Sequence, residues 1–458
     1  MTSPPPTKLR PPLPGGPFLV VGLARSGVAA ARLLASRGET VTGVDSGRPK
    51  EAAGLRALGV EAVLDADGLA LLEGVRTVVK SPGVPREAPV IAAALERGID
   101  VIGELELAWR ATPNRFIAVT GTNGKTTTVE LLGHVYESAA EPVAVAGNVG
   151  TPLSTLAAEG LDPGAVVVCE ASSFQLEDSV EFAPECAVFL NLAPDHLDRH
   201  RDLDSYLAAK LRIFANQGND DVAVYNADEP ALSGVDLGGC ARRVSFGVGP
   251  GPDCEVALAE GTIFADGEPL LRAEELGLFG EHNVANAMAA AAAALAMGLG
   301  RDAVREGLRS FAGVPHRLEP IAEIDGVRFV NDSKATNVAS AIVGLQAFEG
   351  GVHAILGGSD KGEDFTPLIE PIREHCTAIY LTGATAGRMA EELVPVVDAG
   401  VELHRCEGLD DAVARAAAAA SPGEVVLLSP ACASFDAFDD FEARGERFRE
   451  LVRGLEGG

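Results

Sequence analysis

The segment Thr120-Gly-Thr-Asn-Gly-Lys-Thr126 constrains the fold of this chain most strongly. It follows an apolar run, Phe116–Thr120, that predicts a buried strand, and it leads into a predicted helix over 126–137. Glycines in such a loop let the backbone approach phosphate, and the helix N-terminus stabilises negative charge. Lys125 would reach the terminal phosphates and the Thr126 hydroxyl would bind Mg²⁺. The pattern predicts a nucleotide-binding α/β domain, although Val119 stands where the strict motif has glycine.

Similar strand–loop–helix patterns occur towards both ends of the chain. Phe18–Val21 predicts a strand, followed by Gly22-Leu-Ala-Arg-Ser-Gly27 and an alanine-rich helix to about Ser36. Towards the C-terminus, four more apolar runs alternate with predicted helices, at 327–330, 352–356, 377–381 and 424–428. At roughly 150 residues per domain, 458 residues suggest three domains. We therefore expect three α/β domains, of which the first is doubly wound.

The composition of the chain limits the binding partners and the cellular compartment that we expect for it. Lysine plus arginine number 37 and aspartate plus glutamate number 66, which gives a net charge of −29 and argues against nucleic-acid or anionic-membrane binding. The seven cysteines form no CxxC pair, so a zinc ribbon or disulfide framework is not expected. The proline-rich segment 1–17 lacks the apolar region of a signal peptide, and the alanine-rich run 287–296 is too short for a membrane span. A soluble, cytoplasmic protein is expected.

The loop Gly22–Gly27 resembles a dinucleotide-binding fingerprint, but its middle glycine is replaced by Ala24. That glycine normally allows pyrophosphate to lie close to the backbone. A tight turn, NAD binding and the binding of another diphosphate such as UDP therefore all remain open.

The segment Asp195-His-Leu-Asp-Arg-His200 follows a predicted strand at 187–191. His196 and His200 have the spacing of a helical zinc pair, but no further cysteine or histidine nearby in the sequence completes a site. A solvent-exposed polar loop is the alternative.

Lys210 lies in an apolar segment, where helical spacing places it on one face with Tyr206 and Phe214. A lysine in such a stripe commonly extends its amine to solvent. The alternative is a partly buried amine that is modified or paired, because unpaired burial is costly.

Further polar residues follow predicted strands. Glu170 ends an apolar strand, where its carboxylate would suit a Mg²⁺ held with Thr126, or would act as a helix N-cap. In the third domain, three loops rich in small and polar residues follow three strands, at 331–337, 356–362 and 428–434. Their convergence predicts a ligand site at one edge of one sheet.

Together these motifs resemble those of the Mur ligase family, and they occur in the same order along the chain. The resemblance also includes Gly147-Asn148, Glu281-His-Asn-Val-Ala-Asn286 and His316-Arg317, and it covers nearly the whole chain. It implies a Rossmann-like N-terminal domain, a central mononucleotide-binding P-loop α/β domain and a Rossmann-like C-terminal domain. The expected divisions are a proline-rich tail, a UDP-substrate-binding domain, an ATP-binding domain and an amino-acid-binding domain, at 1–17, 18–107, 108–313 and 314–458.

Within the family, the chain resembles the branch that adds D-glutamate. The similarity rests on Glu170-Ala-Ser-Ser-Phe-Gln-Leu-Glu177, Asn331-Asp-Ser-Lys-Ala-Thr-Asn337 and Ser429-Pro-Ala-Cys-Ala-Ser-Phe-Asp436. The branches that add diaminopimelate or lysine, and the branch that adds D-Ala-D-Ala, usually carry Asp-Tyr-Ala-His in place of Asp332-Ser-Lys-Ala. The resemblance implies a monomeric enzyme of peptidoglycan synthesis that uses ATP to join D-glutamate to UDP-N-acetylmuramoyl-L-alanine through an acyl phosphate.

The resemblance also assigns roles to individual residues. The catalytic residues would be Lys125, His196, Lys210 and Lys334. ATP would contact Gly121, Thr122, Asn123, Gly124, Lys125, Thr126, Thr127, Asn148, Asn283, Asn286, Arg317, Asp332 and Lys334. Two Mg²⁺ sites would use Thr126, Glu170, His196 and Lys210, the last as carbamylated N6-carboxylysine. The UDP substrate would contact Arg25, Ser26, Asp45, Ser81 and Asn148, and D-glutamate would contact Thr336, Lys361, Ser434 and Phe441.

Three other functions compete with this interpretation. Another ligase of the superfamily, such as folylpolyglutamate synthase, would use a pterin glutamate in place of a UDP-linked sugar. A non-catalytic nucleotide-binding regulator would form no amide bond. An NAD-dependent dehydrogenase is disfavoured by Ala24 and by the intact Gly-Lys-Thr segment.

Overall fold

The computed structural model describes residues 5–148, 150–195, 199–248, 254–278, 280–360 and 362–455. The chain divides into two compact units, Met1–Leu276 with His282–Phe311, and Gly277–Glu281 with Ala312–Gly458. The first unit holds two sheets and the second holds one. Two residues with expected roles, His196 and Lys361, lie outside the described residues.

The N-terminal sheet is parallel, with the strand order β3-β2-β1-β4-β5. Its strands are β1 (Phe18–Val21), β2 (Val41–Asp45), β3 (Glu61–Leu64), β4 (Thr77–Lys80) and β5 (Asp100–Gly103). The helices around it are α1 (Arg25–Ser36), α2 (Pro89–Glu96), α3 (Glu104–Ala111) and the 3-10 helices η1 (Lys50–Leu58) and η2 (Leu69–Leu72). Because β1 lies between β2 and β4, the loops that follow these strands emerge at one edge. The expected doubly wound fold is confirmed.

The central sheet has the order β14-β13-β12-β11-β10-β9-β6-β8-β7. Its strands are β6 (Arg115–Thr120), β7 (Val143–Gly147), β8 (Val166–Glu170), β9 (Cys186–Phe189), β10 (Val222–Asn226), β11 (Arg242–Val248), β12 (Val256–Ala259), β13 (Thr262–Ala265) and β14 (Glu268–Arg272). Strand β6 lies between β8 and β9 and is parallel to both. The phosphate loop after β6 therefore emerges beside the ends of β8 and β9.

The antiparallel strands β12, β13 and β14 were not predicted from the sequence. They are only partly buried, unlike the fully buried β8 and β9, so their sequences carry a weaker strand signal.

The helices of the central region are α4 (Lys125–Ser138), α5 (Leu153–Glu159), α6 (Ser173–Glu177), α7 (Leu203–Leu211), α8 (Glu281–Ala296), α9 (Arg301–Ser310) and the 3-10 helices η3 (Pro230–Leu232) and η4 (Ala273–Glu275). The alanines of α8 from Ala287 to Ala294 are buried, which confirms the buried helix expected there. Across the described ranges, no helix is both long and apolar enough to cross a membrane.

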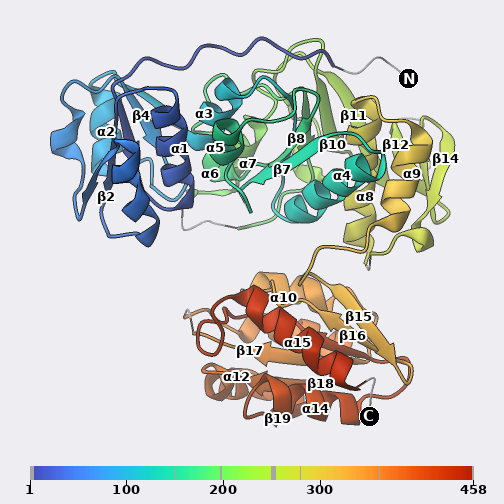
Figure 1. Cartoon of the computed structure of the whole chain (residues 1–458). Helices are drawn as coiled ribbons and strands as arrows, with labels where there is room; N and C mark the ends of the chain where they lie inside the picture. The colour runs from blue at the N-terminus through green and yellow to red at the C-terminus, as the bar shows by residue number, and fades with distance from the viewer. Residues whose placement is uncertain are drawn as a thin grey trace. The chain divides into compact units, whose positions relative to one another are not determined.

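Residues 5–17 form an extended strap along the first unit, called the N-terminal strap below (Figure 1). Arg10 is its main anchor on the central region. The guanidinium lies 3.0 Å from the carboxylate of Glu185, which is fully buried, and 4.7 Å from the centre of the Trp109 ring. At its other end, the carbonyl of Gly15 accepts a 2.9 Å hydrogen bond from the Thr77 hydroxyl of the N-terminal sheet. The strap thus contacts both sheets of the unit.

The second unit has one six-stranded sheet with the order β15-β16-β20-β17-β18-β19. Its strands are β15 (Glu319–Ile324), β16 (Val327–Asn331), β17 (Val352–Gly357), β18 (Cys376–Thr382), β19 (Glu402–Arg405) and β20 (Val425–Leu428). Its helices are α10 (Val338–Leu345), α11 (Ile369–His375), α12 (Ala386–Glu392), α13 (Val394–Val397), α14 (Leu409–Ala419), α15 (Phe441–Leu455) and the 3-10 helix η5 (Thr366–Leu368). Helices α14 and α15 pack on one face of the sheet, and α10 to α13 pack on the other.

Strand β20 lies between β16 and β17 and is parallel to both. The three polar loops singled out in the sequence follow these three strands. They therefore lie at one edge of the sheet, as expected.

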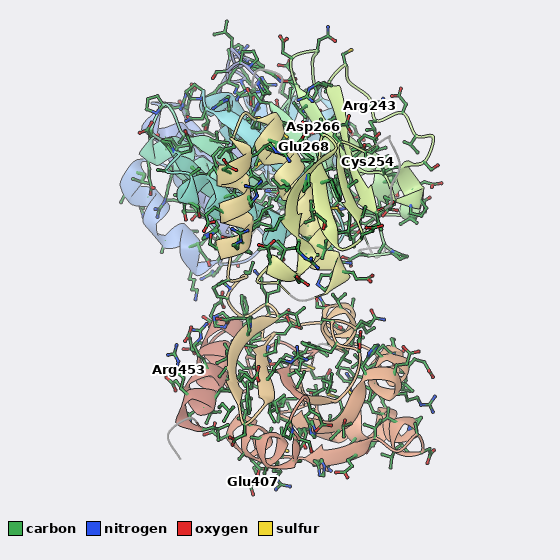
Figure 2. All side chains as sticks on the ribbon, turned by 90° about the vertical axis from the view of Figure 1, so that its right-hand side faces the viewer. Arg243, Cys254, Asp266, Glu268, Glu407 and Arg453 are labelled. Atoms are coloured by element: carbon green, nitrogen blue, oxygen red, sulfur yellow. The ribbon has the colours of Figure 1, made fainter. Side chains whose placement is uncertain are left out.

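Charged side chains lie on the outside of each unit. Arg243 and Glu268 of the first unit, and Glu407 and Arg453 of the second, are exposed (Figure 2). The charged groups that are buried, described next, are therefore exceptions that require partners.

Candidate functional site

The phosphate loop depends on glycine at two positions. Gly121 has φ +155°, and a Cβ there would lie 2.9 Å from the Cβ of Leu190. Gly124 has φ +81°, and a Cβ there would lie 2.2 Å from Oδ1 of Asn286. The side chain of Asn191 holds the loop between them, because its Oδ1 accepts hydrogen bonds from the amides of Thr122 (3.1 Å) and Asn123 (2.8 Å).

Helix α4 begins directly after this loop, and its N-cap, Gly124, provides no side-chain cap. Amides in the first turn of such a helix favour an anion. Lys125 lies at the same end, and its Nζ donates to the carbonyls of Gly121 (2.9 Å) and Thr122 (2.8 Å). Thr126 and Thr127 follow in the first turn and are buried. The loop therefore combines helix amides and a cation, the groups that bind nucleotide phosphates.

Glu170 lies at the end of β8, beside the loop. Its Oε2 accepts a 2.8 Å hydrogen bond from the Thr126 hydroxyl, and its Oε1 accepts a 3.0 Å hydrogen bond from Nδ2 of Asn148. The carboxylate is buried, with 3% of the residue exposed. Because Glu170 caps neither α6 nor α4, the N-cap alternative is wrong; Ser172 caps α6.

The groups beside the loop fit Mg²⁺. In the part of the chain that the structure describes, no three histidine, cysteine, aspartate or glutamate side chains gather into a metal cage. Mg²⁺ is usually held by one or two protein oxygens together with water and substrate phosphates. Thr126 and Glu170 would supply such oxygens.

Lys210 is buried, with 1% of the residue exposed. Its Nζ donates a 2.6 Å hydrogen bond to the carbonyl of Gly121 and lies 4.4 Å from the centre of the Tyr206 ring. Burial, and next the positive charge of Lys125, lower the pKa of Lys210 to about 6. The alternative of an amine extended to solvent is therefore wrong. Phe214 is also buried, but it lies beyond α7, which ends at Leu211, so the expected helical stripe stops short of it.

His200 is buried and not part of an exposed polar loop. Its Nε2 lies 3.0 Å from the Ser173 hydroxyl, and its ring stacks on Phe174 at 5.4 Å. His200 therefore belongs to a packed cluster. Its expected partner in the sequence, His196, is outside the described residues.

Asn283 and Asn286 lie in the first turns of α8 and are buried. Nδ2 of Asn286 donates a 3.0 Å hydrogen bond to Oδ1 of Asn283. The contact of Asn286 with Gly124 places this pair beside the phosphate loop.

The loops expected to hold the UDP substrate meet at the edge of the N-terminal sheet. The Ser81 hydroxyl donates a 2.7 Å hydrogen bond to the carbonyl of Gly22, whose φ is +86°. The Asp45 carboxylate accepts hydrogen bonds from the amides of Leu23 (2.7 Å) and Gly47 (2.8 Å). Arg25, which is exposed, and Ser26 begin α1. The structure thus brings the expected residues of the N-terminal sheet to one edge.

In the second unit, Asp332 is buried at the end of β16. Its Oδ2 accepts a 2.8 Å hydrogen bond from Ser429, and burial raises its pKa to about 7. Nζ of Lys334 lies 5.8 Å from the centre of the Phe441 ring. The amide of Lys334 donates to the carbonyl of His316, next to Arg317, at 2.9 Å.

Arg444 connects two loops of this unit, although no sequence motif singles it out. Its guanidinium donates to the carbonyls of Ser333 (2.8 Å) and Cys432 (3.0 Å), and burial lowers its pKa to about 10. It thereby joins the loop that carries Thr336 to the loop that carries Ser434. Ser434 is buried, whereas Thr336 and Phe441 are partly exposed.

Two more residues beside the site were missed from the sequence, Asn191 and Arg199. Asn191 follows β9, so its position at a strand end was an available signal. Arg199 and Arg444 gave none, because Arg199 donates to the carbonyl of Pro82, 117 positions away, and Arg444 donates to that of Ser333, 111 positions away.

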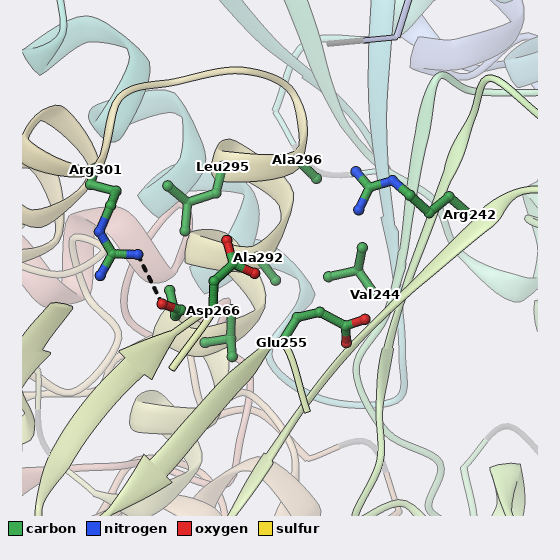
Figure 3. Close-up of a pocket in the computed structure, with 10 residues that line it drawn as sticks. Arg242, Val244, Glu255, Asp266, Ala292, Leu295, Ala296 and Arg301 are labelled. Atoms are coloured by element: carbon green, nitrogen blue, oxygen red, sulfur yellow. Dashed lines mark hydrogen bonds between the residues drawn. The ribbon is translucent and has the colours of Figure 1, made fainter. Parts of the chain in front are cut away.

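A separate cavity of about 360 Å³ lies in the first unit, between the C-terminal half of α8 and strands β11 to β13 (Figure 3). Arg242, Glu255 and Arg301 line it together with Ala292 and Leu295. None of the phosphate-loop residues lines it, and Asn283 and Asn286 are at the other end of α8.

Three family models match the chain in succession. The Mur ligase MurD-like N-terminal domain matches residues 17–103, the Mur ligase middle domain matches residues 119–294, and the Mur ligase glutamate ligase domain matches residues 316–432.

Curated relatives match almost the full length. A UDP-N-acetylmuramoylalanine–D-glutamate ligase of Pelotomaculum thermopropionicum is 42% identical over 96% of this chain and 98% of its own. The ligase of the same name from Solibacter usitatus is 42% identical over 97% of this chain and 99% of its own.

Solved structures show the same fold at lower identity. UDP-N-acetylmuramate–alanine ligase of Thermotoga maritima has a TM-score of 0.58 and 22% identity, over 96% of this chain and 99% of its own. A MurF ligase from the same organism, in complex with ADP, has a TM-score of 0.58 and 18% identity, over 91% of this chain and 95% of its own. The site geometry, the three matched domains and the full-length relatives together establish that this chain belongs to the Mur ligase family.

Proposed function

We propose that the protein joins D-glutamate to UDP-N-acetylmuramoyl-L-alanine, using ATP, in peptidoglycan synthesis. An ATP-dependent ligase is supported most directly by two hydrogen bonds beside the phosphate loop. Thr126 and Asn148 donate them to the buried Glu170 carboxylate. The choice of substrates is supported by the names of relatives that are 42% identical over nearly the whole chain.

The reaction proceeds in two steps on the substrates. The carboxylate of the L-alanyl group attacks the γ-phosphate of ATP to give an acyl phosphate and ADP. The amine of D-glutamate then attacks the acyl carbon, phosphate leaves with the bonding electron pair, and the amine loses a proton. The first step brings two anions together, so the protein must offset their repulsion.

The residues of the phosphate loop have separate roles in this proposal. Amides of 121–127 and the Lys125 ammonium bind the phosphates. Thr126 and Glu170 would hold one Mg²⁺, and Lys210, as N6-carboxylysine, would hold a second together with His196. Mg²⁺ supplies charge stabilisation for phosphoryl transfer. Lys210 is suited to carbamylation, because a buried amine with a pKa near 6 is largely neutral at pH 7. The neutral amine is the form that reacts with CO₂.

The remaining loops bind the other parts of the substrates. Arg25, Ser26, Asp45, Ser81 and Asn148 contact the UDP substrate. Asn283, Asn286, Arg317, Asp332 and Lys334 contact ATP, and Thr336, Lys361, Ser434 and Phe441 contact D-glutamate. We also propose domain boundaries at 18–107, 108–313 and 314–458, a cytoplasmic location and a monomeric state.

A phosphate-release assay across acceptors and amino acids tests the proposal. Wild-type protein with ATP and Mg²⁺ should release phosphate only when both UDP-N-acetylmuramoyl-L-alanine and D-glutamate are present, and L-glutamate should not replace the D-isomer. Release with a pterin glutamate, and none with the UDP-linked sugar, would identify a folylpolyglutamate synthase. ATP binding without any amide product would favour a regulator, and binding of NAD without ATP turnover would favour a dehydrogenase.

A further inference from the structure

Arg199 connects the sugar-nucleotide loop of the N-terminal sheet to the central region. This loop is Ser81-Pro-Gly-Val84, directly after β4. The Arg199 guanidinium donates to the carbonyls of Pro82 (3.1 Å), Gly83 (3.3 Å) and Val84 (2.8 Å). Three contacts from one planar group fix the path of the loop backbone, and a lysine could not reproduce them.

A continuous row of rings leads from Arg199 into the central region. The guanidinium lies 4.5 Å from the centre of the Phe174 ring, and Phe174 stacks on His200 at 5.4 Å with an angle of 12° between the planes. His200 in turn lies 4.9 Å from Tyr206. His200 and Tyr206 are buried, so neither ring can shift without displacing its neighbour.

The far end of the row reaches the phosphate loop. The Tyr206 hydroxyl lies 3.5 Å from the Thr122 hydroxyl, and the Tyr206 ring lies 4.4 Å from Nζ of Lys210. Lys210 donates to Gly121. Unbroken contacts therefore join two loops that follow strands of different sheets, the sugar-nucleotide loop after β4 and the phosphate loop after β6.

We propose that Arg199 and Phe174 are positioning residues that couple UDP-substrate binding to nucleotide binding. The inference rests on the proposed function, which places the UDP substrate at the first loop and ATP at the second. A substrate that orders the sugar-nucleotide loop fixes Arg199, and the packed rings transmit that order to Thr122 and Lys210. Neither positioning residue touches ATP in this proposal, so loss of either removes the coupling and leaves nucleotide affinity alone unchanged.

The test measures ADP binding to the full-length protein by calorimetry, in Mg²⁺, with and without saturating UDP-N-acetylmuramoyl-L-alanine. The ratio of the two ADP dissociation constants is the coupling factor. In wild type we expect a factor of about five or more. In Arg199→Met and in Phe174→Leu it should fall below about two, with the ADP affinity measured alone within about twofold of wild type. The double variant should match the single variants, because both residues lie on one row of contacts.

Arg201→Met is the matched control, because Arg201 is exposed two residues away. It should keep the wild-type factor. Arg199→Met and Phe174→Leu alter different contacts, so if one variant does not fold, the other decides the test. An unchanged coupling factor in a folded variant contradicts the inference, as does a wild-type factor of one. Wild-type protein that does not bind the UDP substrate at all contradicts the proposed function and this inference with it, so the two failures are distinguishable.

Discussion

Nζ of Lys210, on α7, donates a 2.6 Å hydrogen bond to the carbonyl of Gly121, in the phosphate loop. The two residues are 89 positions apart, and their contact puts a buried amine beside Lys125 and Glu170. A permanent cation at this point would repel both Lys125 and any Mg²⁺. The geometry therefore favours an amine that gives up its charge, either by deprotonation or by carbamylation.

Replacement of Lys210 by arginine should remove most of the activity. Arginine keeps the positive charge, but it cannot form a carbamate and is not deprotonated in proteins. We expect phosphate release by Lys210→Arg to fall at least about 100-fold, in the range seen when a group that stabilises transition-state charge is lost. The exposed Lys50→Arg serves as the control and should remain fully active. A Lys210→Arg protein with half the wild-type rate would contradict the carbamate.

The lowered pKa of Lys210 should make stability depend on pH. Between about pH 6 and the ordinary lysine pKa, the folded amine is neutral while the unfolded amine is protonated. The unfolded state then binds the extra proton, so stability rises with pH in this window, by up to about 1.4 kcal/mol per pH unit. Below about pH 6 the contribution is constant.

Urea unfolding at pH 7, 8 and 9, in buffers free of CO₂, nucleotide and Mg²⁺, measures this dependence. Wild-type stability should rise relative to Lys210→Met over that range. Parallel pH profiles for the two proteins would show that Lys210 is protonated in the folded state.

Lys125→Ala should nearly abolish turnover while the fold persists. The side chain lies at the start of α4 and donates to the carbonyls of Gly121 and Thr122, so its loss should affect the phosphates more than the core. We expect at least about a 100-fold loss of phosphate release, with a melting temperature close to wild type. Wild-type turnover by a folded Lys125→Ala protein would refute the ATP assignment.

Arg10→Met should destabilise the first unit through the N-terminal strap. The substitution leaves the buried Glu185 carboxylate without its cation, a change that typically lowers the free energy of unfolding by about 3–5 kcal/mol. Trp109 is the single tryptophan of the chain and lies against Arg10, so its fluorescence reports unfolding at this point.

The control for the strap is Arg48→Met, which breaks the exposed ion pair with Asp65. It should lower the free energy of unfolding by less than about 1 kcal/mol. The double variant Arg10→Met/Glu185→Met should recover part of the loss, because it removes the unpaired charge as well. Equal stability of Arg10→Met and wild type would mean that the strap does not hold the unit together.

Arg444→Met should weaken D-glutamate binding under the proposed function. It frees the loops of Ser333 and Cys432 from one another and leaves their carbonyls unpaired. We expect the KM for D-glutamate to rise about tenfold, a loss of roughly 1.4 kcal/mol, with the KM for the UDP substrate unchanged. Arg447→Met, on the same helix as Arg444, breaks ion pairs with the exposed Asp410 and Glu450 and should leave both constants unchanged.

The sequence alone predicted the three α/β regions and the phosphate loop. Strands β1, β6, β8, β17 and β20 are almost entirely buried and mostly apolar, a pattern that is local in the chain and can be recognised without knowing the neighbouring strands. Polar loops after such strands predicted where ligand-binding edges form, because parallel strands end at a common edge. Half-buried strands such as β14 gave no comparable signal.

Only the tertiary structure decided the state of particular side chains. The spacing of Tyr206 and Lys210 allowed either an exposed or a buried amine, and the Gly121 carbonyl, far away in the chain, settled that it is buried. Likewise, the pairing of Arg10 with Glu185 spans 175 positions and carries no local pattern, so a proline-rich tail could not be distinguished from a strap. A local sequence pattern predicts the backbone conformation of a segment. The protonation state and the hydrogen-bond partners of a buried group depend instead on the residues that the fold places beside it.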